Sequence, residues 1–175
     1  MTTRILTIRR ATMGDLSAVD RLVARSYSRL LAADYPPSTL VLAVPRIARA
    51  RPELLASGTY FLAEDAAGNL LAAGGWTRAT STGTLVRDTG HVRHVATDPD
   101  ALRQGVGRAL MARVMQDAAE GGMCWLDCLS TRTAVPFYTA LGFRLLFPTE
   151  VQLAPGITFP VVRMMADLGQ SAAPK

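Results

Sequence analysis

Cysteine is scarce in this sequence, and its scarcity excludes a structural zinc site. The chain contains two cysteines, Cys124 and Cys128, and no third cysteine could complete a ligand set around them. A structural zinc ion needs four closely arranged Cys or His ligands. We therefore expect no metal site and interpret the two side chains as buried free thiols.

Long apolar runs, signal segments and repeats are also absent. No stretch approaches the length of a membrane span, and Met1 to Asp15 lacks the apolar centre of a secretion signal. These absences predict a cytoplasmic protein without a membrane partner. With 175 residues, of which 49% are hydrophobic and 19% charged, the chain suits one folded domain. We expect that domain over residues 1–168 and a flexible tail over residues 169–175.

Lysine is almost missing, so arginine carries the net charge of +5, and Lys175 is the one lysine. Arginine suits bidentate contacts to phosphate, which favours a partner that carries phosphate groups. The same composition could equally reflect the nucleotide bias of a genome. The arginines are scattered singly through the chain, whereas a nucleic-acid surface usually needs a dense basic stripe. We therefore expect no nucleic-acid partner.

The first half of the chain predicts a strand, a helix and a hairpin. Weak alternation over residues 3–9 is consistent with a strand, and Thr12–Asp15 matches a capping box that opens a helix to about Leu31. Further on, the hydrophobic period changes to two in the runs 59–64 and 70–77. These runs flank a short turn segment and predict an antiparallel hairpin.

Two irregular segments lie in the same half of the chain. Ser38 could cap a second helix, but Pro45 and Pro52 interrupt the pattern, so residues 38–57 predict broken helix and loop. Such a segment could cover a substrate site or be an ordinary connector. Residues 78–89 predict a polar loop.

The second half predicts a strand-helix-strand crossover. A strand over residues 91–97 precedes a helical stripe that begins at Val106 and ends at Gly121-Gly122. The apolar run 123–129 predicts a central strand that is covered on both faces. A short helix and two last strands follow, at residues 133–141, 143–153 and 157–167. This order predicts an α/β (α+β) protein with a mixed sheet between helices.

The glycine turn before the predicted helix suits an anion. The amides of Gly105, Val106, Gly107 and Arg108 fall in the first turn, where they are unpaired and backed by the helix dipole. Such a helix end binds phosphate or pyrophosphate, although a glycine pair before a helix is often only a tight turn. Leu110 stands where the dinucleotide fingerprint needs a third glycine, and the P-loop ending Gly-Lys-Ser/Thr is absent.

The same segment resembles the pyrophosphate loop of the GNAT superfamily of N-acetyltransferases, Arg/Gln-x-x-Gly-x-Gly/Ala after a strand. Residues 103–108 read Arg-Gln-Gly-Val-Gly-Arg and follow Asp98-Pro99. Leu102 departs from the pattern at its first Arg/Gln position, so Arg103, Gln104 or Arg108 would have to supply that donor.

A second match lies downstream. Residues 134–143, Ala-Val-Pro-Phe-Tyr-Thr-Ala-Leu-Gly-Phe, are similar to the family's Ala-x-x-Phe-Tyr-x-x-Leu-Gly-Phe helix. Thr133 stands where the family commonly has an Asn that contacts the cofactor. The resemblance spans roughly residues 5–167 and is most specific over residues 91–143.

The resemblance implies a GNAT-like fold with a mostly antiparallel sheet of about seven strands. It also implies an N-acetyltransferase that transfers an acetyl group from acetyl-CoA to a primary amine of a small molecule or protein, with no metal. A strand-like pairing of the cofactor's pantetheine arm would use the backbone of the strand before the loop. The cofactor-binding residues carried over are Val95, Ala96, Thr97, Arg103, Gln104, Gly105, Val106, Gly107, Arg108 and Thr133.

The resemblance assigns Tyr138 as the acid that protonates the leaving thiolate, although an aromatic residue of this helix could simply pack on the sheet. The base stays unassigned among Glu64, His91 and His94. The two histidines are three residues apart, so strand alternation predicts that they face opposite sides and share no metal.

Other interpretations stay open at this point. A catalytically inactive module that binds or senses acyl-CoA is one alternative, and a basic nucleic-acid-binding domain, supported only by net charge, is another. The resemblance also allows a homodimer through the last strands. Residues 30–57 and 78–90 would select the amine, but they match no pattern that names it or the length of the acyl group.

Overall fold

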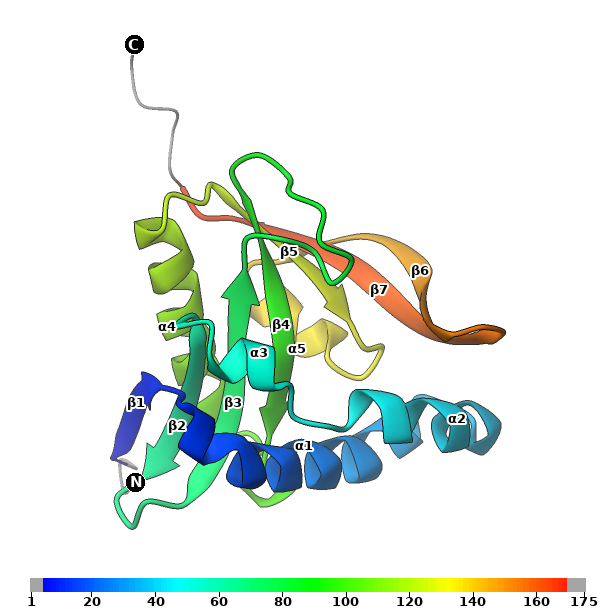
Figure 1. The fold of residues 1–175 in the computed structure, drawn as a ribbon, viewed down its shortest axis with the longest axis horizontal. Coiled ribbons are helices and arrows are strands. Elements are labelled where there is room, and N and C mark those ends of the chain that lie inside the picture. Colours follow the sequence, from blue (N-terminus) through cyan, green and yellow to red (C-terminus); the bar gives the residue numbers. More distant parts are fainter. Residues whose placement is uncertain (1–4, 170–175) are drawn as a thin grey trace.

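Seven strands form one sheet, and helices cover both of its faces (Figure 1). The structure is a computed structural model that describes residues 5–169, so the predicted tail lies outside the described residues except for Gly169. The strands are β1 (Leu6–Arg10), β2 (Tyr60–Asp65), β3 (Leu70–Thr77), β4 (Thr89–Thr97), β5 (Trp125–Ser130), β6 (Arg144–Ala154) and β7 (Ile157–Asp167). The helices are α1 (Leu16–Leu30), α2 (Pro37–Ile47), α3 (Pro52–Leu55), α4 (Val106–Glu120) and α5 (Val135–Ala140), with short 3₁₀ turns η1 (Met13–Asp15), η2 (Leu31–Ala33) and η3 (Pro99–Ala101).

The sheet is mixed and mostly antiparallel, as predicted. Its strands lie in the order β1-β2-β3-β4-β5-β7-β6. Of the strand pairs in residues 5–169, β4 and β5 alone run parallel, because α4 carries the chain back across one face of the sheet between them. The predicted hairpins β2–β3 and β6–β7 and the predicted crossover are all confirmed.

The capping box and the first helix are confirmed. The carboxylate of Asp15 accepts a hydrogen bond from the backbone N–H of Thr12 at 2.7 Å, and α1 ends at Leu30. In residues 5–169 no helix combines the length and the apolar character that a membrane crossing needs.

Residues 38–57 are broken helix and loop, as predicted, because α2 ends at Ile47 and α3 begins at Pro52, but the predicted interruption at Pro45 is wrong. Pro36, not Ser38, is the N-cap of α2, and the helix continues through Pro45. Proline suits the first turn because its missing N–H would have no partner there. Pro45 removes one backbone hydrogen bond, but Ala43 and Ile47 pack against the β6–β7 hairpin. This tertiary burial stabilises a helix that local propensity disfavours.

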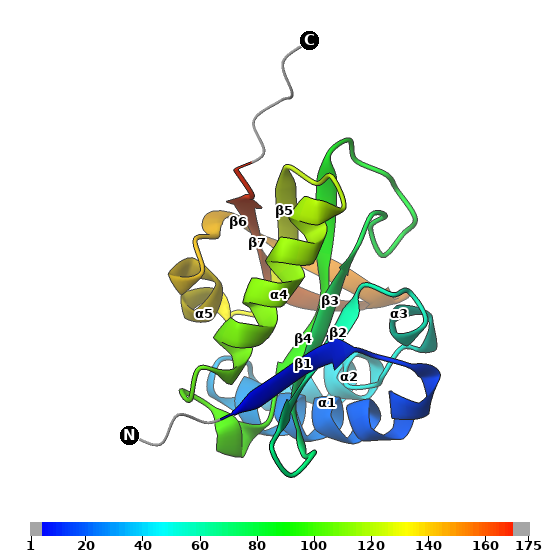
Figure 2. The same cartoon turned by 90° about the vertical axis from the view of Figure 1, so that its left-hand side faces the viewer.

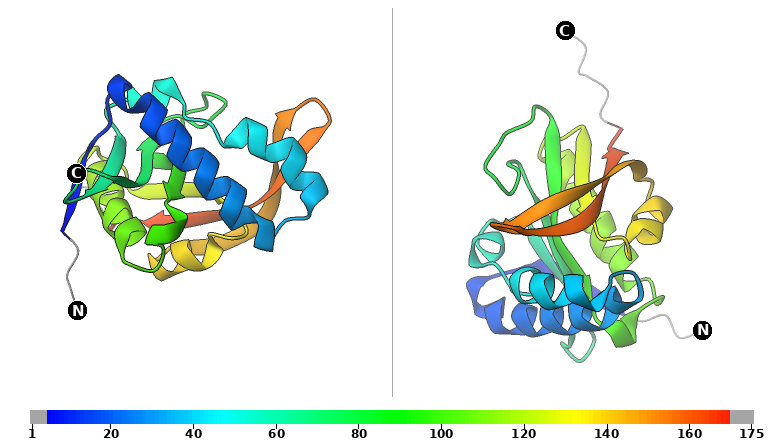
Figure 3. Two further views of the ribbon diagram at one scale, coloured as in Figure 1. Left: turned by 90° about the horizontal axis from the view of Figure 1, so that it is seen from below. Right: turned by 90° about the vertical axis from the view of Figure 1, so that its right-hand side faces the viewer.

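Two layers of helices enclose the sheet. The α4 and α5 layer buries Val106 and Leu110 against Phe61 and Met164, whereas α1 buries Val19 on the opposite face. Figure 2 shows α4 in front of the sheet, and the left view of Figure 3 shows the sheet between α1 and α2 above and α5 below. The chain therefore has two separate faces on which ligands could approach the central strands.

Strand β5 is central, but its side chains are not all covered. Leu126 and Cys128 are buried, whereas Leu129 is 47% exposed, contrary to the prediction of cover on both faces. Leu129 lies beyond the point where β4 leaves β5, so no neighbouring strand protects that side. Cys128 is a buried free thiol as predicted, and Cys124 is a half-buried one that precedes the strand.

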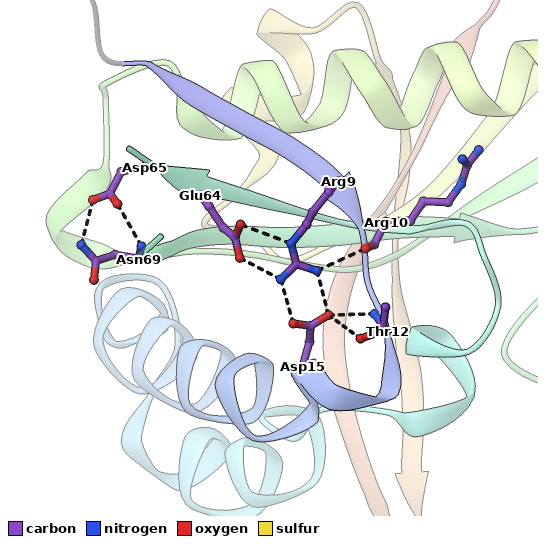
Figure 4. Close-up of polar contacts among 7 residues, drawn as sticks. All are labelled: Arg9, Arg10, Thr12, Asp15, Glu64, Asp65 and Asn69. Atoms are coloured by element: carbon purple, nitrogen blue, oxygen red, sulfur yellow. Dashed lines mark hydrogen bonds and ion pairs between the residues drawn. The ribbon is translucent and has the colours of Figure 1, made fainter. Parts of the chain in front are cut away.

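An arginine at the end of β1 ties the sheet to the first helix (Figure 4). The guanidinium of Arg9 donates two hydrogen bonds to Glu64 on β2, at 2.8 and 3.2 Å, and two to Asp15, at 2.8 and 3.0 Å. Hydrogen bonding from Arg9 is the main reason that the pKa of Asp15 falls to about 2. The network fixes the position of α1 relative to the sheet.

This network predicts a pH-dependent contribution to stability. Asp15→Asn should lower the free energy of unfolding by about 1–2 kcal/mol at pH 7, allowing for solvent screening at partly exposed Arg9. Because the folded pKa of Asp15 lies below its unfolded value, this contribution is present at neutral pH. It is lost as pH falls from about 4 towards 2.

Urea unfolding of both proteins at several pH values measures the difference. Asp34→Asn is the matched control, since Asp34 is an exposed aspartate whose carboxylate has no hydrogen bond or ion pair with any residue in the range 5–169. Equal destabilisation by the two substitutions, or a difference that stays constant with pH, would contradict the assigned role.

Candidate functional site

The two parallel strands at the centre of the sheet separate soon after they meet. β4 and β5 pair at three successive positions, and His91 with Asp127 is the last of them. Residues 92–97 of β4 and 128–130 of β5 continue without pairing to each other. The facing strand edges therefore have backbone groups that the sheet does not satisfy, and such edges can pair with an extended ligand.

The predicted residues Val95, Ala96 and Thr97 are the last three of β4 and belong to this diverging segment. The carbonyl of Val95 already accepts a hydrogen bond from the Tyr27 hydroxyl at 3.1 Å. On the other side, a Cβ at Gly74 of β3 would lie 2.7 Å from Val95 Cγ2, so only glycine permits this close packing.

The predicted glycine turn opens α4 beside the end of β4. Gly105 is the N-cap, with φ of 78°, a conformation that favours glycine. The first intrahelical bond runs from the N–H of Ala109 to the carbonyl of Gly105, so the amides before Ala109 have no carbonyl partner within the helix. Arg103, Gln104 and Gly105 are exposed to solvent. This helix end is thus open to an anion.

The start of α4 contacts both the end of β4 and α5. A Cβ at Gly107 would lie 3.1 Å from the ring of Phe137 and 3.3 Å from Thr97 Oγ1. Arg108 is exposed on the same turn, and Val106 is buried in the core. The fold therefore brings the glycine turn, the diverging strand and α5 together, although they are separate in sequence.

Thr133, a predicted cofactor contact, lies in the turn that leads into α5. Its Oγ1 is buried and has no hydrogen-bond partner among the described residues. An unsatisfied buried hydroxyl is unfavourable unless a ligand or water completes it.

Tyr138 lies in α5 and packs between two aromatic rings. Its side chain is buried, with edge-to-face contacts to Phe137 and Phe143 at ring distances of 5.1 and 5.3 Å. Burial raises the pKa of Tyr138 well above its ordinary value, with the neighbouring Cys128 adding to the effect. Burial also raises the pKa of the Cys128 thiol to about 12. Tyr138 therefore stays protonated at neutral pH.

A cavity of about 240 Å³ lies on the α1 and α2 face of the sheet, beside the diverging strands. We call it the β4–β5 cavity. The cavity is lined by α1, α2, the α2–α3 and β3–β4 connections, strands β4 to β7 and the residue after β5. The lining residues are Tyr27, Ile47, Arg51, Thr80, Ser81, His91, Val92, Arg93, His94, Asp127, Leu129, Thr131, Val151, Leu153, Phe159 and Val161. The segments expected to select the amine thus contribute part of the lining, and β4 to β7 contribute the rest.

A bulge in β4 brings both histidines to this cavity. Residues Ala73–Gly75 of β3 oppose Arg93–Ala96 of β4, so β4 holds one extra residue, and His94 has a positive φ of 50°. A bulge changes the phase of side-chain alternation. His91 and His94 consequently line one cavity, and the prediction that they face opposite sides is wrong.

His91 is held by a carboxylate on the neighbouring strand. Its Nδ1 lies 3.3 Å from Asp127 Oδ2, and Arg163 Nε donates to the other oxygen of Asp127 at 2.8 Å. His91 Nε2 is buried and has no partner among the described residues.

His94 is held by the end of α2. Its Nε2 donates to the carbonyl of Ile47 at 2.7 Å, since a carbonyl can only accept. Burial lowers the pKa of His94, so its ring is neutral and Nδ1 is an acceptor. That Nδ1 is also buried and without a partner in the described part of the chain.

Glu64, the third predicted candidate for the base, lies outside the β4–β5 cavity. Both of its carboxylate oxygens accept from Arg9. Within residues 5–169 no group of three or more His, Cys, Asp or Glu side chains could hold a metal ion.

Asp127 and Arg163 were not predicted as part of a site. Each is a charged residue inside an apolar run, and this is a signal that the sequence does contain. The sequence could not show that the two strands are neighbours or that Asp127 contacts both Arg163 and His91.

Comparisons with known proteins agree with this geometry. Residues 56–145 match the family model of the acetyltransferase (GNAT) domain. Over 63 residues the chain is 35% identical to the [ribosomal protein bS18]-alanine N-acetyltransferase of Escherichia coli (strain K12). This aligned segment covers 34% of this chain and 43% of that protein. The chain therefore spans less than half of the length of the curated relatives it matches.

Solved structures share the whole fold at low identity. PaiA N-acetyltransferase from Thermoplasma acidophilum, in complex with coenzyme A, matches with a TM-score of 0.68 and 13% identity, over 93% of this chain and 99% of that chain. The putative acetyltransferase yncA from Salmonella typhimurium, with its cofactor acetyl-CoA, matches with a TM-score of 0.67 and 18% identity, over 98% of each chain.

The family model covers the hairpin β2–β3, the diverging strands, the glycine turn of α4 and α5, whereas α1, α2 and β7, which line part of the β4–β5 cavity, lie outside the matched residues. The chain belongs to the GNAT acetyltransferase family.

Proposed function

We propose that this protein is an acetyl-CoA-dependent N-acetyltransferase that transfers an acetyl group to a primary amine by direct attack of the amine on the thioester. The observation that carries the proposal is the divergence of β4 from β5 directly beside the open N-terminus of α4. The β4–β5 cavity lies on the face of the sheet opposite α4, so the two substrates would reach the diverging strands from different sides.

The residues beside the divergence suit a coenzyme A molecule. Amides at the start of α4 suit its diphosphate, and the unpaired edge of β4 suits its amide-containing arm. The orphaned hydroxyl of Thr133 would gain a partner there. The residues proposed to hold it are Val95, Ala96, Thr97, Arg103, Gln104, Gly105, Val106, Gly107, Arg108 and Thr133.

Acetyl-CoA, when bound, supplies an acetyl group activated as a thioester. The amine nitrogen forms the new bond to the acetyl carbon, the bond from that carbon to sulfur breaks, and sulfur needs a proton. Tyr138 Oη is proposed to donate it, on the ground of its place in the family's α5 motif, and its phenol is protonated at neutral pH. The amine must lose a proton, and His91 and His94 are the two predicted bases that line the β4–β5 cavity.

The finer points of function stay predictions. The E. coli relative acts on an alanine of ribosomal protein bS18, so a protein amine and a small-molecule amine are both acceptors to test. The cytoplasmic location, the single-domain boundary and the homodimer also stay predictions. A module that binds acyl-CoA without chemistry is the alternative, and it predicts no thiol release with any amine.

The phosphate-binding role of the α4 N-terminus is tested with two acyl donors. Gly105→Val should weaken acetyl-CoA binding roughly tenfold, because a β-branched residue disfavours the positive φ that aligns the amides. Binding of acetylpantetheine, which lacks the diphosphate, should be equally weak in both proteins. Isothermal titration calorimetry measures all four affinities.

Gly156→Val is the matched control, since Gly156 has a φ of 74° in the β6–β7 turn and the same kind of strain there. It should leave acetyl-CoA affinity unchanged. No heat from acetyl-CoA with the folded natural protein would overturn the proposed function.

The acid role of Tyr138 is tested by Tyr138→Phe. The substitution keeps the ring packing with Phe137 and Phe143 and removes only the hydroxyl. We expect kcat in thiol-release assays to fall by roughly 10²-fold or more, with acetyl-CoA affinity and thermal stability retained. Unchanged kcat would show that Tyr138 only packs.

A further inference from the structure

We propose that the acceptor is an amino-carboxylate with an apolar side group, a molecule of the size of an α-amino acid, bound in the β4–β5 cavity. The inference rests on the proposed function and names the class of amine. It depends on three properties of the cavity: two guanidinium groups that no carboxylate of the cavity lining pairs with, two imidazole acceptors without a donor, and an apolar wall.

The cationic part of the cavity consists of Arg51 and Arg93. Within the described residues the guanidinium of Arg93 makes one hydrogen bond, from Nη1 to Thr77 Oγ1 at 3.1 Å. Arg51 has an ion pair with Glu53 of 3.9 Å, which is at the limit of such a contact. Both guanidinium groups therefore keep unused donors beside the cavity.

These two charges lack a counter-ion within the cavity. Asp127 is the one carboxylate among the described residues that lines it, and Arg163 and His91 already occupy its oxygens. Burial, followed by the charge of Arg51, lowers the pKa of Arg93, and Glu53 offsets only part of this. Two cations held together in a partly buried hollow favour an anionic ligand, and the planar guanidinium suits a carboxylate.

The two histidines supply hydrogen-bond acceptors for the amino group of the ligand. In a neutral His91 ring, Nδ1–H faces Asp127, which leaves Nε2 as an acceptor, and in His94 the acceptor is Nδ1. Both nitrogens are buried and have no donor in the part of the chain that the structure describes. An amine would offer the N–H groups that these two atoms lack.

The rest of the wall is apolar, and the space is small. Leu129, Val151, Leu153, Phe159 and Val161 line it. Its volume of about 240 Å³ is below the range of roughly 300–1,000 Å³ that is usual for drug-sized ligands. A single apolar amino acid suits this space and charge. A polyamine or a basic peptide does not, because Arg51 and Arg93 would repel it.

The test compares acceptors that differ only by a carboxylate. L-phenylalanine and phenethylamine form one pair, and L-leucine and 3-methylbutylamine form another. With the natural enzyme we expect kcat/KM to be at least roughly tenfold higher for the amino acid in one pair or both. Arg93→Gln should remove this preference by lowering kcat/KM for the amino acid roughly 10- to 100-fold, while kcat/KM for the amine stays unchanged.

Three further variants sharpen the result. Arg93→Lys keeps the charge but not the planar fork, so it should recover only part of the preference. Arg51→Gln should act in the same direction as Arg93→Gln. Arg144→Gln, on exposed β6 outside the cavity, should have no effect. Thermal unfolding of each variant identifies any that lose the fold. If the Arg93 or the Arg51 variant does so, the acceptor preference is measured with the other.

Calorimetry separates this inference from the proposed function. Acetyl-CoA binding is measured first, and its absence would contradict the proposed function. L-phenylalanine, N-acetyl-L-phenylalanine and phenethylamine are then titrated into the protein with and without coenzyme A, which needs no turnover. Stronger binding of the carboxylates, lost in Arg93→Gln, supports the inference. Equal binding of amine and amino acid, binding that ignores Arg93, or no binding of any amino acid overturns it.

Discussion

The short parallel contact between β4 and β5 is the constraint on which the rest of the structure depends. A parallel pair needs a long crossover, here α4, which places a helix N-terminus next to the strand it has just left. Because pairing ends at His91 and Asp127, the strands beyond them keep unsatisfied backbone edges. The glycine turn, the diverging strands and α5 thus meet at one place.

The bulge in β4 decides what the other face of the sheet presents. One extra residue near His94 gives His91, Arg93 and His94 access to one cavity, where strict alternation would have separated the histidines. Burial then disfavours extra charge on His94, and Asp127 fixes the ring of His91. The result is a hollow with cationic donors and imidazole acceptors that the chain itself leaves unsatisfied.

Local signals in the sequence were strong where a short segment decides its own structure. The Thr12–Asp15 capping box, the β2–β3 hairpin and the Gly105 turn were predicted correctly, because each depends on backbone preferences within a few residues. Pro45 misled the prediction, since packing of α2 on the β6–β7 hairpin outweighs one missing hydrogen bond. The role proposed for Tyr138 rests on the family resemblance. The sequence alone cannot distinguish a tyrosine that only packs in the core from one that also donates a proton.

The sequence by itself determined the order of elements and the place of the glycine turn, since periodicity and turn chemistry are local properties, and the resemblance of two short motifs indicated the family. Only the tertiary structure decided which distant side chains share a space. Asp127 and Arg163 are charged residues in apolar runs, but their contact and the contact of Asp127 with His91 depend on strand order and register. Those depend on long-range pairing, which no local pattern specifies, so the β4–β5 cavity belongs to the fold and not to any one segment.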